Sequence, residues 1–166
     1  MGALFPAPEP RGAEAPPEAT ALVVRPATAA DLDAVMAIER ASFGDPWPDR
    51  AFADSLRDAG LSFLVASVGG EVAGYVIAWF VVDEGEIANL AVRPASRGRG
   101  IGKALLDAAL GLGRARGTLA TFLEVRESNV VARALYASRR FEEIGRRRGY
   151  YRRPPEDAIV LRRVEG

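Results

Sequence analysis

The sequence predicts a mixed α/β (α+β) fold with one mostly antiparallel sheet, one parallel strand pair and about four flanking helices. Two strand-like runs meet at Gly69-Gly70, which is a strong signal for an antiparallel hairpin. After residue 86, strand-like and helix-like segments alternate, and such β-α-β units imply parallel pairing. Two further strand-like runs from Phe141 onward imply a closing antiparallel pair.

The first half of the predicted domain follows a segment with little to bury. Residues 1–20 are rich in Ala, Pro, Glu and Gly, so we expect a flexible tail followed by a folded domain over residues 21–166. Thr28-Ala-Ala-Asp31 resembles a capping box and predicts that a helix begins there. The expected elements are a strand at 22–25, a helix with Leu32, Val35 and Met36 on one face that ends before Gly44–Pro48, a helix at 49–57, and strands at 62–68 and 71–81.

The second half alternates strands and helices. Leu105, Leu106, Ala109 and Leu110 have the spacing of a buried helix face. The expected elements are a strand at 86–92, a helix at 98–116, a strand at 119–125, a helix at 129–138, and strands at 141–148 and 158–163.

The overall composition narrows the chemistry. The chain has 166 residues, is 49% hydrophobic and 27% charged, and carries no formal net charge, so its charge does not point to nucleic acid or membrane as a partner. It contains no cysteine and no histidine, which excludes disulfides, thiol nucleophiles and the usual zinc or haem ligands. Proton transfer therefore falls to Glu, Asp, Tyr, Lys or water. Without a membrane-length apolar run or a signal sequence, we expect a cytoplasmic protein.

A glycine-rich turn, Arg97-Gly-Arg-Gly-Ile-Gly102, links the predicted strand 86–92 to the helix behind it. Glycines let the backbone approach a ligand closely, and the N–H groups at a helix N-terminus attract phosphate. Arg97, Arg99 and Lys103 add positive charge. The alternative is a surface turn with solvated arginines, but its place between a strand and an amphipathic helix favours a pyrophosphate site.

An acid and a phenol lie on the next two elements. Glu124 belongs to the apolar run 119–125, and Ser128-Asn129 opens the short helix that carries Tyr136. A phosphate-binding turn with a proton acceptor and a proton donor is typical of group-transfer enzymes that use a phosphorylated carrier. Each residue also has a purely structural interpretation: Glu124 pairs with an arginine, Tyr136 packs in the core, and Asn129 caps the helix.

Arg97-x-x-Gly100-x-Gly102 matches the pyrophosphate motif of the GCN5-related N-acetyltransferase (GNAT) superfamily. Within it, the chain is most similar to the bacterial group that acetylates the N-terminal alanine of a ribosomal protein, and the resemblance covers residues 21–164. The segments that carry it are Phe43-x-x-Pro46-Trp47, Asn89-Leu-Ala-Val92, Leu123-Glu-Val-Arg126, Ser128-Asn129, Ala134-Leu-Tyr136, Phe141, Tyr150-Tyr151 and Glu156-Asp-Ala158.

The resemblance implies a GNAT fold and an N-acetyltransferase that uses acetyl-CoA, needs no metal and acts on a free protein N-terminus, that of a ribosomal protein. It implies Glu124 as general base and Tyr136 as general acid. The groups that it implies for acetyl-CoA are the main chain of Leu90, Ala91 and Val92, the turn residues Arg97, Gly98, Arg99, Gly100, Ile101, Gly102 and Lys103, and Asn129. We expect a monomer or weak dimer, and direct transfer in a ternary complex because no cysteine can carry the acyl group.

Three aromatic residues, Trp47, Tyr150 and Tyr151, are expected to frame the acceptor peptide, because large amphipathic rings suit a slot that must grip a chain end. Arg146-Arg147-Arg148 beside the two tyrosines resembles a nucleic-acid site, but the neutral overall charge favours a solvated strand end.

Two positions depart from the family. Arg140 stands before Phe141 where Gly is usual, and a non-glycine residue in a left-handed helix end costs roughly 1 kcal/mol, so we expect the turn to differ there. Pro48 stands where Ser is common, and because proline suits the first turn of a helix, we expect the fold to be unaffected.

Three questions of function stay open. Glu84 and Glu86 lie at or just before the start of the predicted strand 86–92, where other members of the superfamily place their base, and Glu86 is the alternative to Glu124. The acceptor could instead be a lysine side chain or a small amine. The domain could also bind acetyl-CoA without catalysing any transfer.

Overall fold

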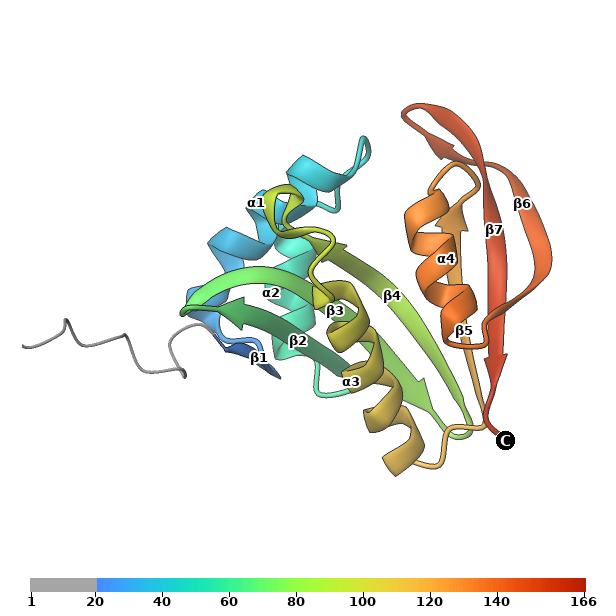
Figure 1. The fold of residues 1–166 in the computed structure, drawn as a ribbon, viewed down its shortest axis with the longest axis horizontal. Coiled ribbons are helices and arrows are strands. Elements are labelled where there is room, and N and C mark those ends of the chain that lie inside the picture. The colour runs from blue at the N-terminus through green and yellow to red at the C-terminus, as the bar shows by residue number, and fades with distance from the viewer. Residues whose placement is uncertain (1–20) are drawn as a thin grey trace, which may run out of the picture.

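A computed structural model of the chain describes residues 21–166, which form a seven-stranded sheet in the order β1-β2-β3-β4-β5-β7-β6 (Figure 1). The predicted tail, residues 1–20, lies outside the described residues. The strands are β1 (Leu22–Pro26), β2 (Leu61–Val68), β3 (Glu71–Val81), β4 (Glu84–Val92), β5 (Ala120–Arg126), β6 (Glu142–Arg152) and β7 (Pro155–Val164). The helices are α1 (Leu32–Ser42), α2 (Asp49–Arg57), α3 (Ile101–Ala115) and α4 (Val130–Ser138), with 3₁₀ turns at Ala29–Asp31 and Pro94–Ser96.

The sheet is antiparallel except where β4 meets β5, so the predicted fold class and the predicted parallel pair are confirmed. The parallel pairing is short: only residues 84–86 of β4 pair with residues 120–122 of β5. Beyond that point the two strands diverge, and the sheet opens toward their C-terminal ends (Figure 1). This opening between β4 and β5 provides the space in which the candidate site lies.

The second β-α-β unit does not produce neighbouring parallel strands, contrary to the sequence-based expectation. β7 lies between β5 and β6 and is antiparallel to both. The physical reason is burial: Ala158, Ile159 and Leu161 of β7 are buried, whereas β6 is exposed along almost its whole length. The more apolar strand therefore takes the inner position, and the arginine-rich strand becomes a charged edge that resists further strand pairing.

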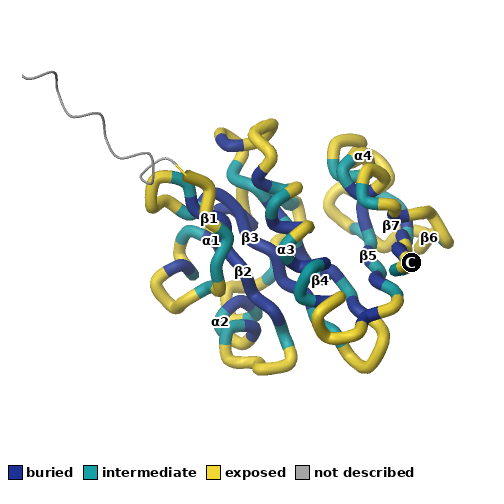
Figure 2. The backbone as a smooth tube through the Cα atoms, turned by 60° about the horizontal axis from the view of Figure 1, so that its bottom comes forward, coloured by how far each residue is buried: buried dark blue, intermediate teal, exposed yellow. Residues whose placement is uncertain are grey.

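Two clusters of apolar side chains cover the two faces of the sheet. Successive residues of a strand point to opposite faces, so Leu64 and Ala66 of β2 pack with α3 while Phe63 and Val65 pack with α1 and α2. The central strands β2 and β3 are buried, as Figure 2 shows in dark blue. The rigid, double-sided centre thus fixes β4, the strand that borders the opening.

Of two predicted helix starts, the first is confirmed and the second lies later than predicted. The capping box is confirmed, because the Asp31 carboxylate accepts hydrogen bonds from the Thr28 N–H at 2.8 Å and the Thr28 hydroxyl at 3.1 Å. The hydrogen-bonded Arg25 guanidinium lowers the pKa of Asp31 to about 2. The helix predicted at 98–116 begins later, at Ile101, because Gly98 and Gly100 have φ of 77° and 79° and cannot belong to a right-handed helix.

The end of α4 keeps its left-handed geometry, so the turn does not differ as expected from the lack of glycine. Arg140 itself has φ of 64°. Its N–H donates to the Ala137 carbonyl at 3.0 Å and the Phe141 N–H donates to the Tyr136 carbonyl at 3.1 Å, which together form a Schellman motif. The rings of Tyr136 and Phe141 pack at 5.7 Å and close the motif. Pro48 caps α2, which spans the predicted residues 49–57.

Replacing Arg140 with glycine is expected to stabilise the protein. Relief of a left-handed non-glycine residue gains about 1–2 kcal/mol, and the greater freedom of glycine in the unfolded chain offsets about 0.5–1 kcal/mol of it. The free energy of unfolding in urea should therefore rise by about 0.5–1 kcal/mol. Ala137→Gly, an exposed position within the same helix, is the matched control and should lower it by about 1 kcal/mol. A lower value for Arg140→Gly would contradict the assigned strain.

Candidate active site

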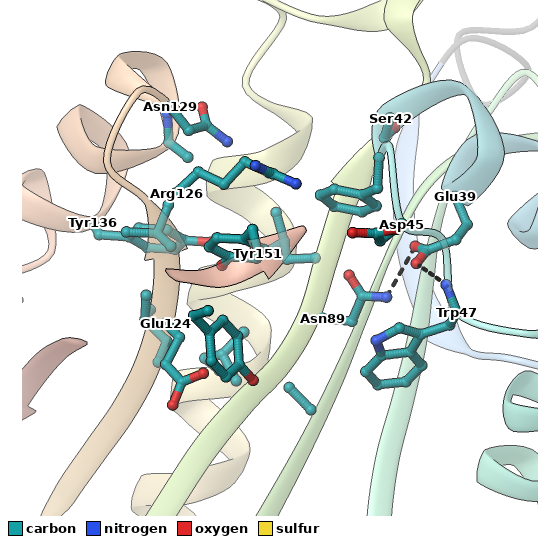
Figure 3. A pocket seen from close by; sticks show the side chains of 18 of the residues that line it. Glu39, Ser42, Asp45, Trp47, Asn89, Glu124, Arg126, Asn129, Tyr136 and Tyr151 are labelled. Atoms are coloured by element: carbon teal, nitrogen blue, oxygen red, sulfur yellow. Dashed lines mark hydrogen bonds between the residues drawn. The ribbon is translucent and has the colours of Figure 1, made fainter. Parts of the chain in front are cut away.

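A cavity of about 360 Å³ occupies the opening between β4 and β5 (Figure 3). One side is built by α1, the loop 43–47 and β4, and the other by β5, α4 and the end of β6. The polar and aromatic side chains that line it are Glu39, Ser42, Phe43, Asp45, Trp47, Glu86, Asn89, Glu124, Arg126, Asn129, Tyr136, Tyr150 and Tyr151. The cavity therefore unites the predicted acid, phenol and three framing aromatic residues in one place.

Glu124 points into the cavity from β5, and its side chain is 20% exposed. Its Oε1 lies 2.7 Å from Nε of Arg147 on β6, so the predicted structural role, pairing with an arginine, is also present. The Arg147 side chain is 61% exposed. An ion pair with one solvated partner is worth little, about 0–1 kcal/mol, so a competing cation can displace Arg147 from Glu124.

Glu86 lies beside Glu124 on the neighbouring strand and lines the same cavity. Glu86 is the last residue of β4 that pairs with β5, where its partner is Phe122, and Glu124 lies two residues beyond Phe122 on β5. Burial, and then the negative charge of Glu124, raise the pKa of Glu86 above its usual range. The structure thus brings both candidate bases together. It also distinguishes them, because the positively charged Arg147 forms its ion pair with Glu124.

Tyr136 faces the cavity from the last turn of α4 and is 7% exposed. Burial raises the pKa of the Tyr136 phenol well above its usual range, so the hydroxyl stays protonated and can act as a donor. Tyr150 and Tyr151 line the outer part, with ring centroids 5.1 Å apart and nearly perpendicular. Burial raises the pKa of Tyr151 to about 12, so it is also protonated at neutral pH.

The glycine turn lies at the N-terminus of α3 and follows the 3₁₀ turn Pro94–Ser96, which comes after β4. A Cβ atom added at Gly98 or Gly100 would meet no atom within 4 Å, so the turn is an open cradle for a ligand. Arg99 and Lys103 are exposed there. The side chain of Arg97 instead ties the turn to the protein: it donates to the Val92 carbonyl at 3.0 Å and the Ser42 hydroxyl at 3.1 Å. Arg97 is thus less available to a phosphate than the motif suggested.

Two other residues predicted to hold the cofactor also have structural roles. Asn129 lines the cavity, and its Oδ1 accepts a hydrogen bond from the Ala132 N–H at 3.1 Å, so it caps α4 as the alternative interpretation held. Leu90 lines the cavity, while Leu90, Ala91 and Val92 pair with β3 on one side and have no strand partner on the other within residues 21–166. That free strand edge can offer main-chain groups to a ligand.

Glu39 is a central residue of the site that the sequence analysis missed. It lies on α1, is 1% exposed, and accepts hydrogen bonds from the Tyr75 hydroxyl, from Nδ2 of Asn89 at 2.9 Å and from the Trp47 N–H at 2.9 Å. The bond to Trp47 fixes the loop that carries this ring, which packs against Phe52 at 5.7 Å. The one signal of Glu39 in the sequence was its spacing: it lies four residues after the apolar Val35 and so on the same helix face.

Among residues 21–166, no helix has both the length and the apolar character needed to cross a membrane. The same residues contain no group of three or more acidic side chains placed to hold a metal ion.

Glu39→Gln is expected to lower the free energy of unfolding by about 1–3 kcal/mol, because an amide NH₂ would face one of three hydrogen-bond donors. Urea denaturation measures the change. Glu71→Gln is the matched control: the Glu71 side chain is 75% exposed, so its loss should change stability by less than about 0.5 kcal/mol. Equal stability of the two variants would show that the Glu39 carboxylate does not hold the loop.

Glu86→Gln is expected to stabilise the protein at neutral pH, because it removes the carboxylate whose pKa burial and Glu124 raise. A raised pKa means that the folded state binds the proton of Glu86 more tightly than the unfolded state does. The stabilisation from this proton is fully present below pH 4.5, the ordinary pKa of the group, and is lost as the pH rises through the raised pKa of Glu86 in the folded protein. The unfolding midpoint of Glu86→Gln should exceed that of the wild type at pH 7 and converge with it in acid. Glu84→Gln, exposed on the same strand, is the matched control, and its unfolding midpoint at pH 7 should stay close to that of the wild type. A lower midpoint at pH 7 would contradict the assigned shift.

Comparisons with known proteins show which family the chain belongs to. A sequence model of the acetyltransferase (GNAT) family matches residues 32–141. The ribosomal protein bS18-alanine N-acetyltransferase of Escherichia coli K12 is 37% identical over 133 residues, which are 79% of this chain and 89% of that protein. The N-alpha-acetyltransferase RimI of Mycobacterium tuberculosis is 40% identical over 126 residues, which are 74% of this chain and 78% of that protein.

A solved structure shows the same similarity in three dimensions. The crystal structure of the ribosomal-protein-S18-alanine N-acetyltransferase from Escherichia coli superposes with a TM-score of 0.79 at 33% identity. The match covers 86% of this chain and 92% of that chain.

Proposed function

The chain belongs to the acetyltransferase (GNAT) family, and we propose that it transfers acetyl to the free α-amine of a protein N-terminus, the N-terminal alanine of a ribosomal protein. Family membership makes it an N-acetyltransferase that uses acetyl-CoA. The observation that carries the proposal is one cavity lined by an acid, Glu124, a protonated phenol, Tyr136, and the rings of Trp47, Tyr150 and Tyr151.

Glu124 is the proposed general base. A peptide α-amine has a pKa of about 7.7–8.0, so roughly a tenth of it is already neutral at pH 7 and the base that deprotonates the rest need not be strong. The ammonium form of the acceptor is a cation, and it can displace the exposed Arg147 guanidinium from the Glu124 carboxylate. Glu86 then remains as the second carboxylate of the site, close enough for its pKa to respond to Glu124.

Tyr136 is the proposed general acid. When bound, acetyl-CoA supplies the acetyl group as a thioester whose sulfur leaves as a thiolate. Tyr136, kept protonated by burial, can donate its proton to that sulfur. The free edge of β4 at Leu90–Val92 can provide N–H groups that stabilise the developing oxyanion.

The residues proposed to hold acetyl-CoA fit the ligand's charge and shape. The open cradle at Gly98 and Gly100 and the N-terminus of α3 suit a pyrophosphate, with Lys103 and Arg99 exposed nearby. The set proposed here is Leu90, Ala91, Val92, Arg97 to Lys103 and Asn129, with Arg97 acting through its main chain because its side chain is engaged within the protein.

The protein N-terminus is the acceptor that the surroundings favour. Trp47 and Tyr151 line the cavity from opposite sides (Figure 3), and Tyr150 lines it as well, which suits a narrow chain end. Two relatives with substantial coverage are named for N-terminal acetylation, one of them for alanine of ribosomal protein bS18. Trp47, Tyr150 and Tyr151 are therefore proposed to contact the acceptor.

Kinetics with short peptides test the roles of the acidic residues and the phenol. Glu124→Gln and Tyr136→Phe are each expected to lower kcat by about 10²–10⁴-fold without weakening acetyl-CoA binding, because each loses one proton transfer. Glu86→Gln is the matched control and should keep kcat within about threefold of the wild type. A large loss in Glu86→Gln with little loss in Glu124→Gln would assign the base to Glu86.

The choice of peptide tests the acceptor class. Peptides with free N-terminal Ala should be acetylated, and the same peptides with a blocked N-terminus and an internal lysine should not. A lysine amine has a pKa of about 10.4, so it is less often neutral and depends more on the base. Acetylation of the blocked, lysine-containing peptides would contradict the proposed acceptor.

A further inference from the structure

The Arg126 side chain joins the strand of the proposed base to the turn between β6 and β7. Its Nη1 donates to the Pro154 carbonyl at 3.0 Å, and its Nη2 donates to the Arg153 carbonyl at 3.0 Å. It also lies 3.4 Å from the Glu156 carboxylate and 4.2 Å from the ring centroid of Tyr151. The Arg126 side chain is only 16% exposed, so solvent screens these contacts little.

This turn needs such support, because the β6–β7 ladder is interrupted just before it. Arg147 pairs with Ala158 and Tyr151 pairs with Glu156, so three residues of β6, 148–150, oppose a single residue of β7. A bulge of this kind breaks the ladder and loosens what lies beyond it. Arg126 on β5 reaches across to the segment 151–156 and supplies hydrogen bonds that the ladder does not.

The same turn meets the loop 43–48 and closes the entrance on one side. A methyl group at Gly44 would collide with the Arg153 carbonyl oxygen, so the two segments are in direct contact. Asp45 accepts a hydrogen bond from the Arg152 N–H at 3.3 Å, and its ion pair with Arg153 spans 3.5 Å. The Arg153 side chain is 81% exposed, so this ion pair is worth little. The turn is therefore positioned by Arg126, which binds its two carbonyl groups, and by Ser128, whose N–H and hydroxyl donate to the Glu156 carboxylate at 2.7 and 2.9 Å.

We infer that Arg126 is a positioning residue that fixes the segment 151–156, and with it Tyr151, as a wall of the acceptor slot. The inference rests on the proposed function, in which Tyr151 contacts the acceptor. Glu124 and Arg126 are two residues apart on β5 and so share one face of the strand. Strand β5 thus carries both Glu124, the proposed base, and Arg126, which fixes the distance between that base and the wall of the acceptor slot.

Arg126→Lys tests this role, because a lysine carries one compact charge and cannot donate to two carbonyl groups while stacking on a ring. The KM for an Ala-terminated peptide is expected to rise by about tenfold or more, with kcat and the KM for acetyl-CoA within about twofold. Arg126→Gln also loses the positive charge and should show the same rise in peptide KM with kcat nearly unchanged. It replaces Arg126→Lys in the experiment if the lysine variant does not fold. Arg162→Lys, at an exposed position of β7, is the matched control and should leave all three constants unchanged.

Hydrogen exchange of the free protein provides a readout that needs no acceptor. The amides of Tyr151, Arg152, Arg153 and Glu156 should exchange faster in Arg126→Lys than in the wild type, whereas those of β2 and β3 should not change. If Arg126→Lys is active and its peptide KM is unchanged, the inference about Arg126 is wrong while the proposed function stands. Unchanged hydrogen exchange in the segment 151–156 would overturn the inference in the same way. A fall in kcat with unchanged KM would assign Arg126 to the chemistry instead. Absence of peptide acetylation by the wild type would instead refute the proposed function, on which the acceptor role of the wall depends.

Discussion

The short parallel pairing of β4 and β5 is the constraint on which the site depends. Three residues of each strand pair, and the strands then separate. A fully paired sheet would leave no room between Leu90 on one side and Glu124 on the other. Because the pairing stops, the edge of β4 keeps main-chain groups free for a ligand, and side chains from both halves of the fold face one cavity.

The carboxylates around this cavity have different roles because their neighbours differ. Glu39 is buried among three neutral donors, which fix its oxygens and through them the loop that carries Trp47. Glu124 is partly exposed and faces a cation that solvent can easily replace. Glu86 is held beside Glu124 and has a raised pKa as a result of burial and that charge. Position in the fold, rather than residue type, thus separates the structural acid Glu39 from Glu124, the acid proposed as the base.

Much of the fold could be predicted because its signals are local. Gly69-Gly70 marked the β2–β3 hairpin, and the pattern after Pro48 marked α2. The inner position of β7 could not be predicted, since it depends on which closing strand buries more. Likewise Glu39 gave little signal, because its partners Tyr75 and Asn89 lie 36 and 50 residues away in the sequence. Glu124 and Tyr136 were found through a family motif, whereas Arg147 beside Glu124 emerged only from the packing of β6.

Hydrogen exchange measured by NMR, with and without acetyl-CoA, tests most directly whether the opening between β4 and β5 is the cofactor site. Acetyl-CoA should slow exchange of amides at residues 88–92 on the free edge of β4 and at 98–103 in the glycine turn, and leave the already paired strand β2 unchanged. Binding of acetyl-CoA without protection of either segment, or with protection confined to another part of the sheet, would contradict the assignment of this opening as the active site.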